Sequence, residues 1–218
     1  MNILHGIRST ILAAFFSLPL LFISFTAFLA IALGTPGLFI LLLGQLLLSV
    51  TTFGFHLLES IIERLVPFLT PYLAVTADRA ALLQGSTSGS PVNVFPSYWM
   101  VHVLFFLSYL LANAVDVFKA DSDSNASDWQ VSNRKSKAVA VMIVLVLVMV
   151  ALTVSRYFLT GAETLGGVLI SLPVIAVGFG WYKLAKTCGA RDSDIFGIIQ
   201  QMTPNGGAPT TCVYTPIA

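Results

Sequence analysis

The sequence has little charge. Only 10% of its 218 residues are Asp, Glu, Lys or Arg, whereas soluble domains average about 25%. Hydrophobic residues make up 56% of the chain and gather in long runs. The net charge of +1 provides no strong field for attracting nucleic acid. This composition is typical of an integral membrane protein that contacts the lipid bilayer and binds no nucleic acid.

Cysteine and catalytic motifs are also scarce. The two cysteines, Cys188 and Cys212, are too few for a disulfide framework. They form either one bridge near the C-terminus or, as we favour, two free thiols. The sequence contains no nucleophile elbow, phosphate-binding loop or zinc-protease motif, and its three histidines are not at metal-ligand spacing. We therefore expect no enzyme activity, metal, cofactor or small-molecule substrate.

Long apolar runs predict an all-α, multi-pass protein with about five membrane helices, since a span needs about 20 apolar residues. The runs cover about Thr10–Leu33, Pro36–Leu58, Pro96–Phe118, Ala138–Phe158 and Thr164–Lys186. The first run exceeds the roughly 7–15 residues of a signal-peptide core, so we interpret it as a helix. Thr35 is expected to cap the second helix, and Pro173 to kink the fifth. Alternatively, the first two runs form a re-entrant hairpin.

These runs divide the chain into four parts. Residues 1–58 form an N-terminal helical hairpin in the membrane. Residues 59–95 combine an interfacial, broken helix with a Gly/Ser/Pro loop. Residues 96–186 hold three transmembrane helices, with a solvated polar loop at 119–137. Residues 187–218 form a C-terminal tail.

The distribution of basic residues predicts the orientation, because cytosolic loops are rich in Lys and Arg. One side carries Arg8, Arg64, Arg79 and Arg156; the other carries Lys119, Arg134, Lys135, Lys137, Lys183, Lys186 and Arg191. The second side is richer, so we place the 119–137 loop and the tail in the cytosol. The pairs Tyr98–Trp99 and Trp181–Tyr182 are interpreted as interfacial aromatic belts.

Two of the predicted helices carry a polar stripe at helical spacing. The stripe residues are Gln45, Ser49, Thr52, His56, Glu59 and Glu63 in the second run, and His102, Tyr109, Asn113 and Asp116 in the third. Polar groups facing lipid are costly, so the stripes should face each other or a partner. We favour hydrogen bonding between helices. The alternative is a proton or ion path, as in a small transporter or channel subunit.

The C-terminal tail has the composition of a docking segment. Asp194 is suited to cap the N-terminus of a short helix. The residues that follow it provide an apolar surface: Ile195, Phe196, Ile198, Ile199 and Met202. A Gly/Pro break then leads to a β-prone end that contains Cys212, Val213 and Tyr214. Such a tail frays alone in water, so we expect it to bind a partner. Otherwise it lies back on its own protein.

The motif "PSYWMVHVLFFLSYLLANA" together with "DIFGIIQQMTP" and "CVYTP" resembles multi-pass membrane proteins of large icosahedral double-stranded DNA viruses of the algal-virus type. The residues that carry this resemblance are Tyr98, Trp99, His102, Phe105, Phe106, Asn113, Asp194, Phe196, Gly197 and Pro204. The resemblance implies a minor capsid component in the internal virion membrane, with its tail towards the capsid. We therefore expect a structural protein that anchors a membrane to other proteins of a large assembly.

Overall fold

The computed structural model describes residues 13–65, 97–120, 128–159 and 165–188, with Ile7, Thr10, Ile11 and Glu163; for residues 53–64, 130 and 159 it describes the backbone only. Every element in this part is helical, so the all-α prediction is confirmed there. The elements are α2 (Leu18–Leu33), α3 (Pro36–Leu65), α6 (Tyr98–Lys119), α7 (Asp128–Val154), the π-helix η2 (Ser155–Leu159), α8 (Leu165–Ser171) and α9 (Pro173–Thr187).

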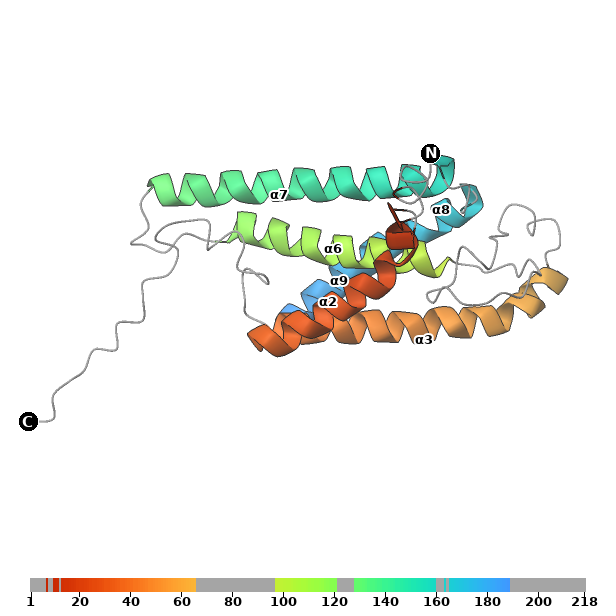
Figure 1. The fold of residues 1–218 in the computed structure, drawn as a ribbon. Helices are drawn as coiled ribbons and strands as arrows, with labels where there is room; N and C mark the ends of the chain where they lie inside the picture. The colour runs from red at the N-terminus through yellow and green to blue at the C-terminus, as the bar shows by residue number, and fades with distance from the viewer. Residues whose placement is uncertain are drawn as a thin grey trace, which may run out of the picture.

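Helix α6 is the centre of the bundle. It packs against α2, α3, α7, α8 and α9, and Figure 1 shows it between α7 and α3. Its residues from Trp99 to Tyr109 are all buried, which fits a mostly apolar helix surrounded by other helices. The hydroxyl of Ser97 caps its first turn by accepting a hydrogen bond from the backbone N–H of Met100 at 3.5 Å. The predicted third span is therefore a core helix.

Helix α7 lies along one side of α6 and exposes most of its length (Figure 1). Only 6% of its most apolar 18-residue stretch is buried within the protein. The Val- and Leu-rich surface of this stretch suits contact with lipid. The helix begins at Asp128, ten positions before the predicted start at Ala138. Residues 128–137 therefore belong to α7, which corrects the prediction of a polar loop over 119–137. Asp128 in the first turn favours this start, because carboxylates stabilise helix N-termini.

Helices α8 and α9 are one apolar segment with a break at Leu172. Pro173 opens α9, because proline has no N–H to continue the ladder of α8. The kink predicted at this proline is thus present. Gly178 lets α9 approach α6 closely: a Cβ there would collide with Ser108 Oγ and lie 2.9 Å from the carbonyl oxygen of Phe105.

Helices α2 and α3 form a hairpin. Gly34 turns the chain with φ of 62°, a conformation that glycine adopts without strain. The carbonyl of Thr35 accepts from the backbone N–H of Leu38 at 3.2 Å. The hydroxyl of Thr35, however, is buried without a hydrogen-bond partner in the described part of the chain. The predicted side-chain cap at Thr35 is therefore wrong.

The lengths of the helices decide which of them can span a membrane. Three segments are long and apolar enough: Tyr98–Lys119, Val131–Phe158 and Leu165–Thr187. Helix α2 has 16 residues, or about 24 Å, short of the roughly 30 Å of hydrocarbon. Helix α3 continues to Leu65, beyond the predicted end at Leu58. Three spans are consistent with an integral membrane protein, whereas about five spans are not confirmed.

Candidate functional site

The polar side chains around α6 form contacts at three levels of the bundle. The first level is where α6 begins, the second lies near its middle, and the third is near its C-terminal end. Each level joins α6 to a different set of neighbours. The levels contain Ser49 and all four stripe residues of α6, so together they form the candidate site.

Within the first two turns of α6, the two stripes meet at Ser49 and His102. Ser49 Oγ lies 2.8 Å from His102 Nε2, and His102 Nδ1 lies 2.8 Å from the carbonyl oxygen of Tyr98. A carbonyl oxygen only accepts, so Nδ1 donates to it and, in the neutral ring, Nε2 accepts from the Ser49 hydroxyl. His102 is fully buried. This contact joins α3 directly to α6.

Two other members of the stripe on α3, Thr52 and Gln45, form no side-chain hydrogen bond to α6 among the described residues. The Thr52 hydroxyl donates to the carbonyl of Leu48, on its own helix, at 2.7 Å. Gln45 is fully buried, and neither atom of its side-chain amide has a hydrogen-bond partner among the described residues. His56 and Glu59 lie on α3, but their side chains are outside the described ones.

At the middle level, Tyr109 makes a further direct contact between α6 and α3. Its hydroxyl is buried and donates to the carbonyl oxygen of Gly37 at 3.0 Å. Gly37 lies in the first turn of α3, so this bond fixes the start of that helix against α6. Edge-to-face packing of Tyr109 on Tyr182, with ring centroids 5.3 Å apart, links the same position to α9.

At the C-terminal level, the stripe on α6 faces α9 rather than α3. Asn113 Nδ2 donates to the hydroxyl of Tyr182 at 3.2 Å, and that hydroxyl donates to Asp116 Oδ2 at 3.0 Å. Lys186 Nζ lies 2.6 Å from both oxygens of Asp116. Tyr182 is buried, whereas the Lys186 side chain is 52% exposed. The chain of bonds therefore runs from the core to the surface.

The level where α6 begins holds a buried ion pair that the stripe pattern did not identify. Arg156 in η2 donates from Nε to Glu163 Oε1 at 3.3 Å, and both side chains are fully buried. The guanidinium lies 5.0 Å from the centre of the Trp99 ring and 5.3 Å from that of Phe16. Burial raises the pKa of Glu163, and hydrogen bonding to Ser97 and the charge of Arg156 offset part of this shift.

The aromatic pairs predicted as interfacial belts mostly pack inside the protein. Trp99 is 1% exposed, and its Nε1 donates to the carbonyl oxygen of Phe15 at 2.8 Å. Trp181 is half-buried, and its Nε1 donates to the carbonyl oxygen of Ile40 at 2.8 Å. Their indole groups therefore connect helices. The interpretation as belts is wrong for the buried Trp99 and Tyr182.

Comparison with known proteins adds no family to this geometry. No family model matches the chain, and no curated protein or solved structure is significantly similar to it.

The chemistry of the site is that of a set of links between helices. In the part of the chain that the structure describes, no three His, Cys, Asp or Glu side chains lie together as metal ligands would. The polar groups of α6 bond instead to hydroxyls, carbonyls and one lysine on α3 and α9. Cys188 carries a free, exposed thiol. Cys212 and the docking residues Asp194, Ile195, Phe196, Ile198, Ile199, Val213 and Tyr214 lie outside the described residues.

Sequence features could have identified Arg156 and Glu163. They lie close together in the sequence, in a stretch otherwise free of charge that connects two apolar runs. A lone basic and a lone acidic residue in such a connection are paired more often than not when they are buried. The contact of Arg156 with Trp99 and Phe16, by contrast, depends on tertiary packing and has no signal in the local sequence.

Proposed function

We propose that this protein is a structural integral membrane protein that anchors a membrane to a large assembly. The observation that supports this role best is the use of the polar groups along α6. They bond to α3 through His102 and Tyr109, and to α9 through Asn113 and Asp116. Such bonds hold helices together. The bundle thereby serves as a rigid anchor, and residues 187–218 serve as its docking tail.

The proposed partners are other proteins of the assembly. The resemblance to membrane proteins of icosahedral DNA viruses extends the proposal to a viral capsid and its internal membrane. In that setting the protein is a minor capsid component. The tail then docks through the apolar side chains of Ile195, Phe196 and their neighbours.

The proposed orientation places the tail on the cytosolic side. Helix α6 ends at Lys119 and α9 ends at Thr187, and the bond between Asp116 and Lys186 joins these two ends. Arg134, near the start of α7, donates to the carbonyl oxygen of Ala120 at 2.6 Å. Several of the basic residues therefore gather at one end of the bundle, which supports a cytosolic position for that end.

Removing the tail tests the docking role. A chain that lacks residues 192–218 is expected to insert into the membrane as the full chain does, because its three spans are intact. The shortened chain is expected to be lost from purified particles or complexes of the assembly. Immunoblotting measures its amount relative to that of a resident membrane protein. Full retention of the shortened chain would contradict the proposal.

A photo-crosslinking amino acid at Phe196 of the full-length chain locates the partner. The expected product is a covalent adduct with another polypeptide, identified by mass spectrometry. The same amino acid at Val150, which is exposed on α7, is the control for nonspecific capture in the membrane. Adducts confined to this chain would mean that the tail folds back on its own bundle.

Conduction is the alternative, and the packing supports it less. His102 and Tyr109 are fully buried and bonded to their neighbours, and Asp116 is held by Lys186 and Tyr182. We expect vesicles that contain the protein to show no proton or ion flux at any pH. Flux that Glu59→Gln and His102→Ala both abolish would support the transporter and count against the anchor.

Catalysis by Ser49 and His102 is also testable. Their hydrogen bond has the geometry of a nucleophile and a base, but a backbone carbonyl stands in place of the carboxylate that usually orients the base. The imidazole is fully buried, so no substrate carbonyl reaches it. We expect a fluorophosphonate probe to leave Ser49 unlabelled in the full-length protein. Labelling that disappears in Ser49→Ala would assign a hydrolase.

A further inference from the structure

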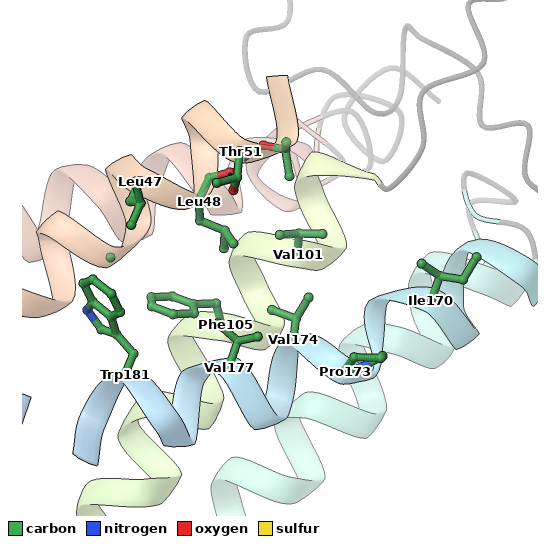
Figure 2. Close-up of a pocket in the computed structure, with 12 residues that line it drawn as sticks. Leu47, Leu48, Thr51, Val101, Phe105, Ile170, Pro173, Val174, Val177 and Trp181 are labelled. Atoms are coloured by element: carbon green, nitrogen blue, oxygen red, sulfur yellow. Dashed lines mark hydrogen bonds between the residues drawn. The ribbon is translucent and has the colours of Figure 1, made fainter. Parts of the chain in front are cut away.

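An apolar groove lies between α3 and the α8–α9 segment, and α6 forms its floor. Its volume is about 480 Å³. Figure 2 shows Leu47, Leu48 and Thr51 on one wall and Val174, Val177 and Trp181 on the other. Val101 and Phe105 of α6 lie between these walls. The groove is therefore built from side chains of all three neighbouring helices.

The groove is closed at one end by a tight contact. A Cβ on Gly44 would lie 2.5 Å from Trp181 Nε1 and 2.6 Å from the ring of Phe105, so α3 and α9 touch there. The hydrogen bond from Trp181 Nε1 to Ile40 fixes this contact. Towards Thr51 and Ile170 the walls separate (Figure 2), where the chain breaks at Pro173. The kink and the glycine contact together give the groove its wedge shape.

The lining offers no free hydrogen-bond donor to a ligand. None of its residues is charged. The hydroxyls of Thr51 and Thr52 both donate to the carbonyl of Leu48, at 2.9 and 2.7 Å. The indole N–H of Trp181 is used by Ile40. An occupant that must satisfy its own hydrogen bonds, such as a polar ligand or an extended peptide, gains nothing here.

The groove is continuous with the apolar outer surface of the spans. Leu47 and Val177 on its rim are 48% and 49% exposed, and Leu169 beside it is 56% exposed. The segment Leu165–Thr187 is long and apolar enough to cross a membrane. If it does, this surface faces the hydrocarbon of the bilayer. Lipid chains therefore have direct access to the groove.

The wedge shape favours a flexible chain over a helix. The groove narrows to the tight contact of Gly44 with Trp181 and Phe105, and a helix about 10 Å wide does not fit into that end. A helix from a second copy or another protein would therefore stay on the rim. It would leave the half-buried lining at Leu48 and Val174 without contacts, and such voids lose dispersion energy. A hydrocarbon chain bends and can follow the wedge to its closed end.

We propose that this groove binds a hydrocarbon chain of a membrane lipid. The bound chain fills the space beneath the kink and packs α3 against α9 through its own methylene groups. The proposal is independent of the docking tail, so it stands or falls separately from the anchoring role.

The test uses the full-length protein in phosphatidylcholine vesicles with a photoactivatable diazirine on the acyl chain. After irradiation, mass spectrometry maps the labelled residues. Labelling is expected to be several-fold stronger on Leu48, Val174 and Val177 than on the exposed face of α7. Val174→Phe and, separately, Leu48→Phe fill the groove and should each reduce labelling of the remaining lining residues several-fold. Val150→Phe, on the exposed surface of α7, is the matched control and should leave it unchanged.

Two results would overturn the proposal. Equal labelling of the groove and of α7 would mean that lipids only surround the protein. Labelling that persists in both filling variants would mean that the chain binds elsewhere. Thermal unfolding of each variant shows whether it has kept its fold. The two filling positions lie on different helices. If one of the two variants fails to fold, the other one still provides the test. Retention of a single phospholipid in native mass spectra, reduced by filling, is the independent readout.

Discussion

Ser49 on α3 and His102 on α6 form a hydrogen bond between the two helices, with Oγ 2.8 Å from Nε2. Because Nδ1 of the same ring is held by the carbonyl of Tyr98, the imidazole cannot rotate away without breaking a second bond. Ser49 Oγ also lies 3.0 Å from the carbonyl of Gln45 on its own helix. The hydroxyl therefore has a local alternative, and the bond between the helices should have moderate strength.

A double-mutant cycle measures the strength of this bond. Ser49→Ala and His102→Phe are each expected to lower the free energy of unfolding, and their coupling should be about 0.6 kcal/mol and not above about 1.7 kcal/mol. Reversible unfolding in mixed micelles provides the measurement. Thr153→Ala removes a hydroxyl that bonds only within α7, and it should show no coupling to His102→Phe. A coupling of zero for Ser49 would contradict the contact.

The close approach of α6 and α9 at Gly178 gives a second prediction. Gly178→Ala places a methyl group against Ser108 Oγ and 2.9 Å from the carbonyl oxygen of Phe105. Overpacking of this kind costs about 1–3 kcal/mol. Gly180→Ala is the matched control, because its methyl group meets no atom within 4 Å, and stability should be unchanged or slightly raised. Equal stability of the two variants, measured by thermal unfolding, would show that the helices are farther apart.

Composition and periodicity were sufficient for the helices but not for their partners. The long apolar runs predicted all three spans, and Pro173 predicted the break before α9. The stripe residues of α6 do share one face of the helix, as their spacing predicted. The spacing cannot predict which neighbouring helix that face contacts. Asn113 and Asp116 bond to α9 because Tyr182 and Lys186 lie there. Only the tertiary arrangement of the helices decides this.

The boundaries of helices were missed where polar residues begin or extend an apolar helix. Helix α7 starts at Asp128, in a stretch whose charge suggested a loop. Arg134 in that stretch bonds to the carbonyl of Ala120, just after α6 ends. A cation there is favourable because the C-terminus of a helix is partly negative. The polar residues thus hold two helix ends together, a role that hydropathy alone cannot reveal.

Two ion pairs among the described residues should differ greatly in their contribution to stability. Arg156 and Glu163 are fully buried, whereas the side chains of Lys186 and Asp116 are 52% and 25% exposed. Removing one member of a buried pair strands the other charge, so Arg156→Met is expected to cost about 3–5 kcal/mol. Lys186→Met should cost about 0.2–1 kcal/mol, because water screens the charge that remains. Denaturant unfolding of both variants in the same detergent compares them directly, and equal losses would contradict the burial of Arg156.

The carboxyl group of Glu163 should make stability depend on pH. Burial raises its pKa in the folded protein above the ordinary value of 4.5, so the folded state binds the proton more tightly than the unfolded state does. Stability from this group is therefore full below about 4.5 and is lost as the pH rises through the folded pKa.

Thermal unfolding of the wild type between pH 4 and pH 8 should show this decline, and Glu163→Gln should flatten it, because an amide has no proton to lose. Asp128→Asn removes an exposed carboxylate and serves as the control, with the slope of the wild type retained. A wild-type protein that becomes more stable over the same pH range would show that the charge of Arg156 outweighs the burial of Glu163. A decline that remains in Glu163→Gln would assign the pH dependence to a different group.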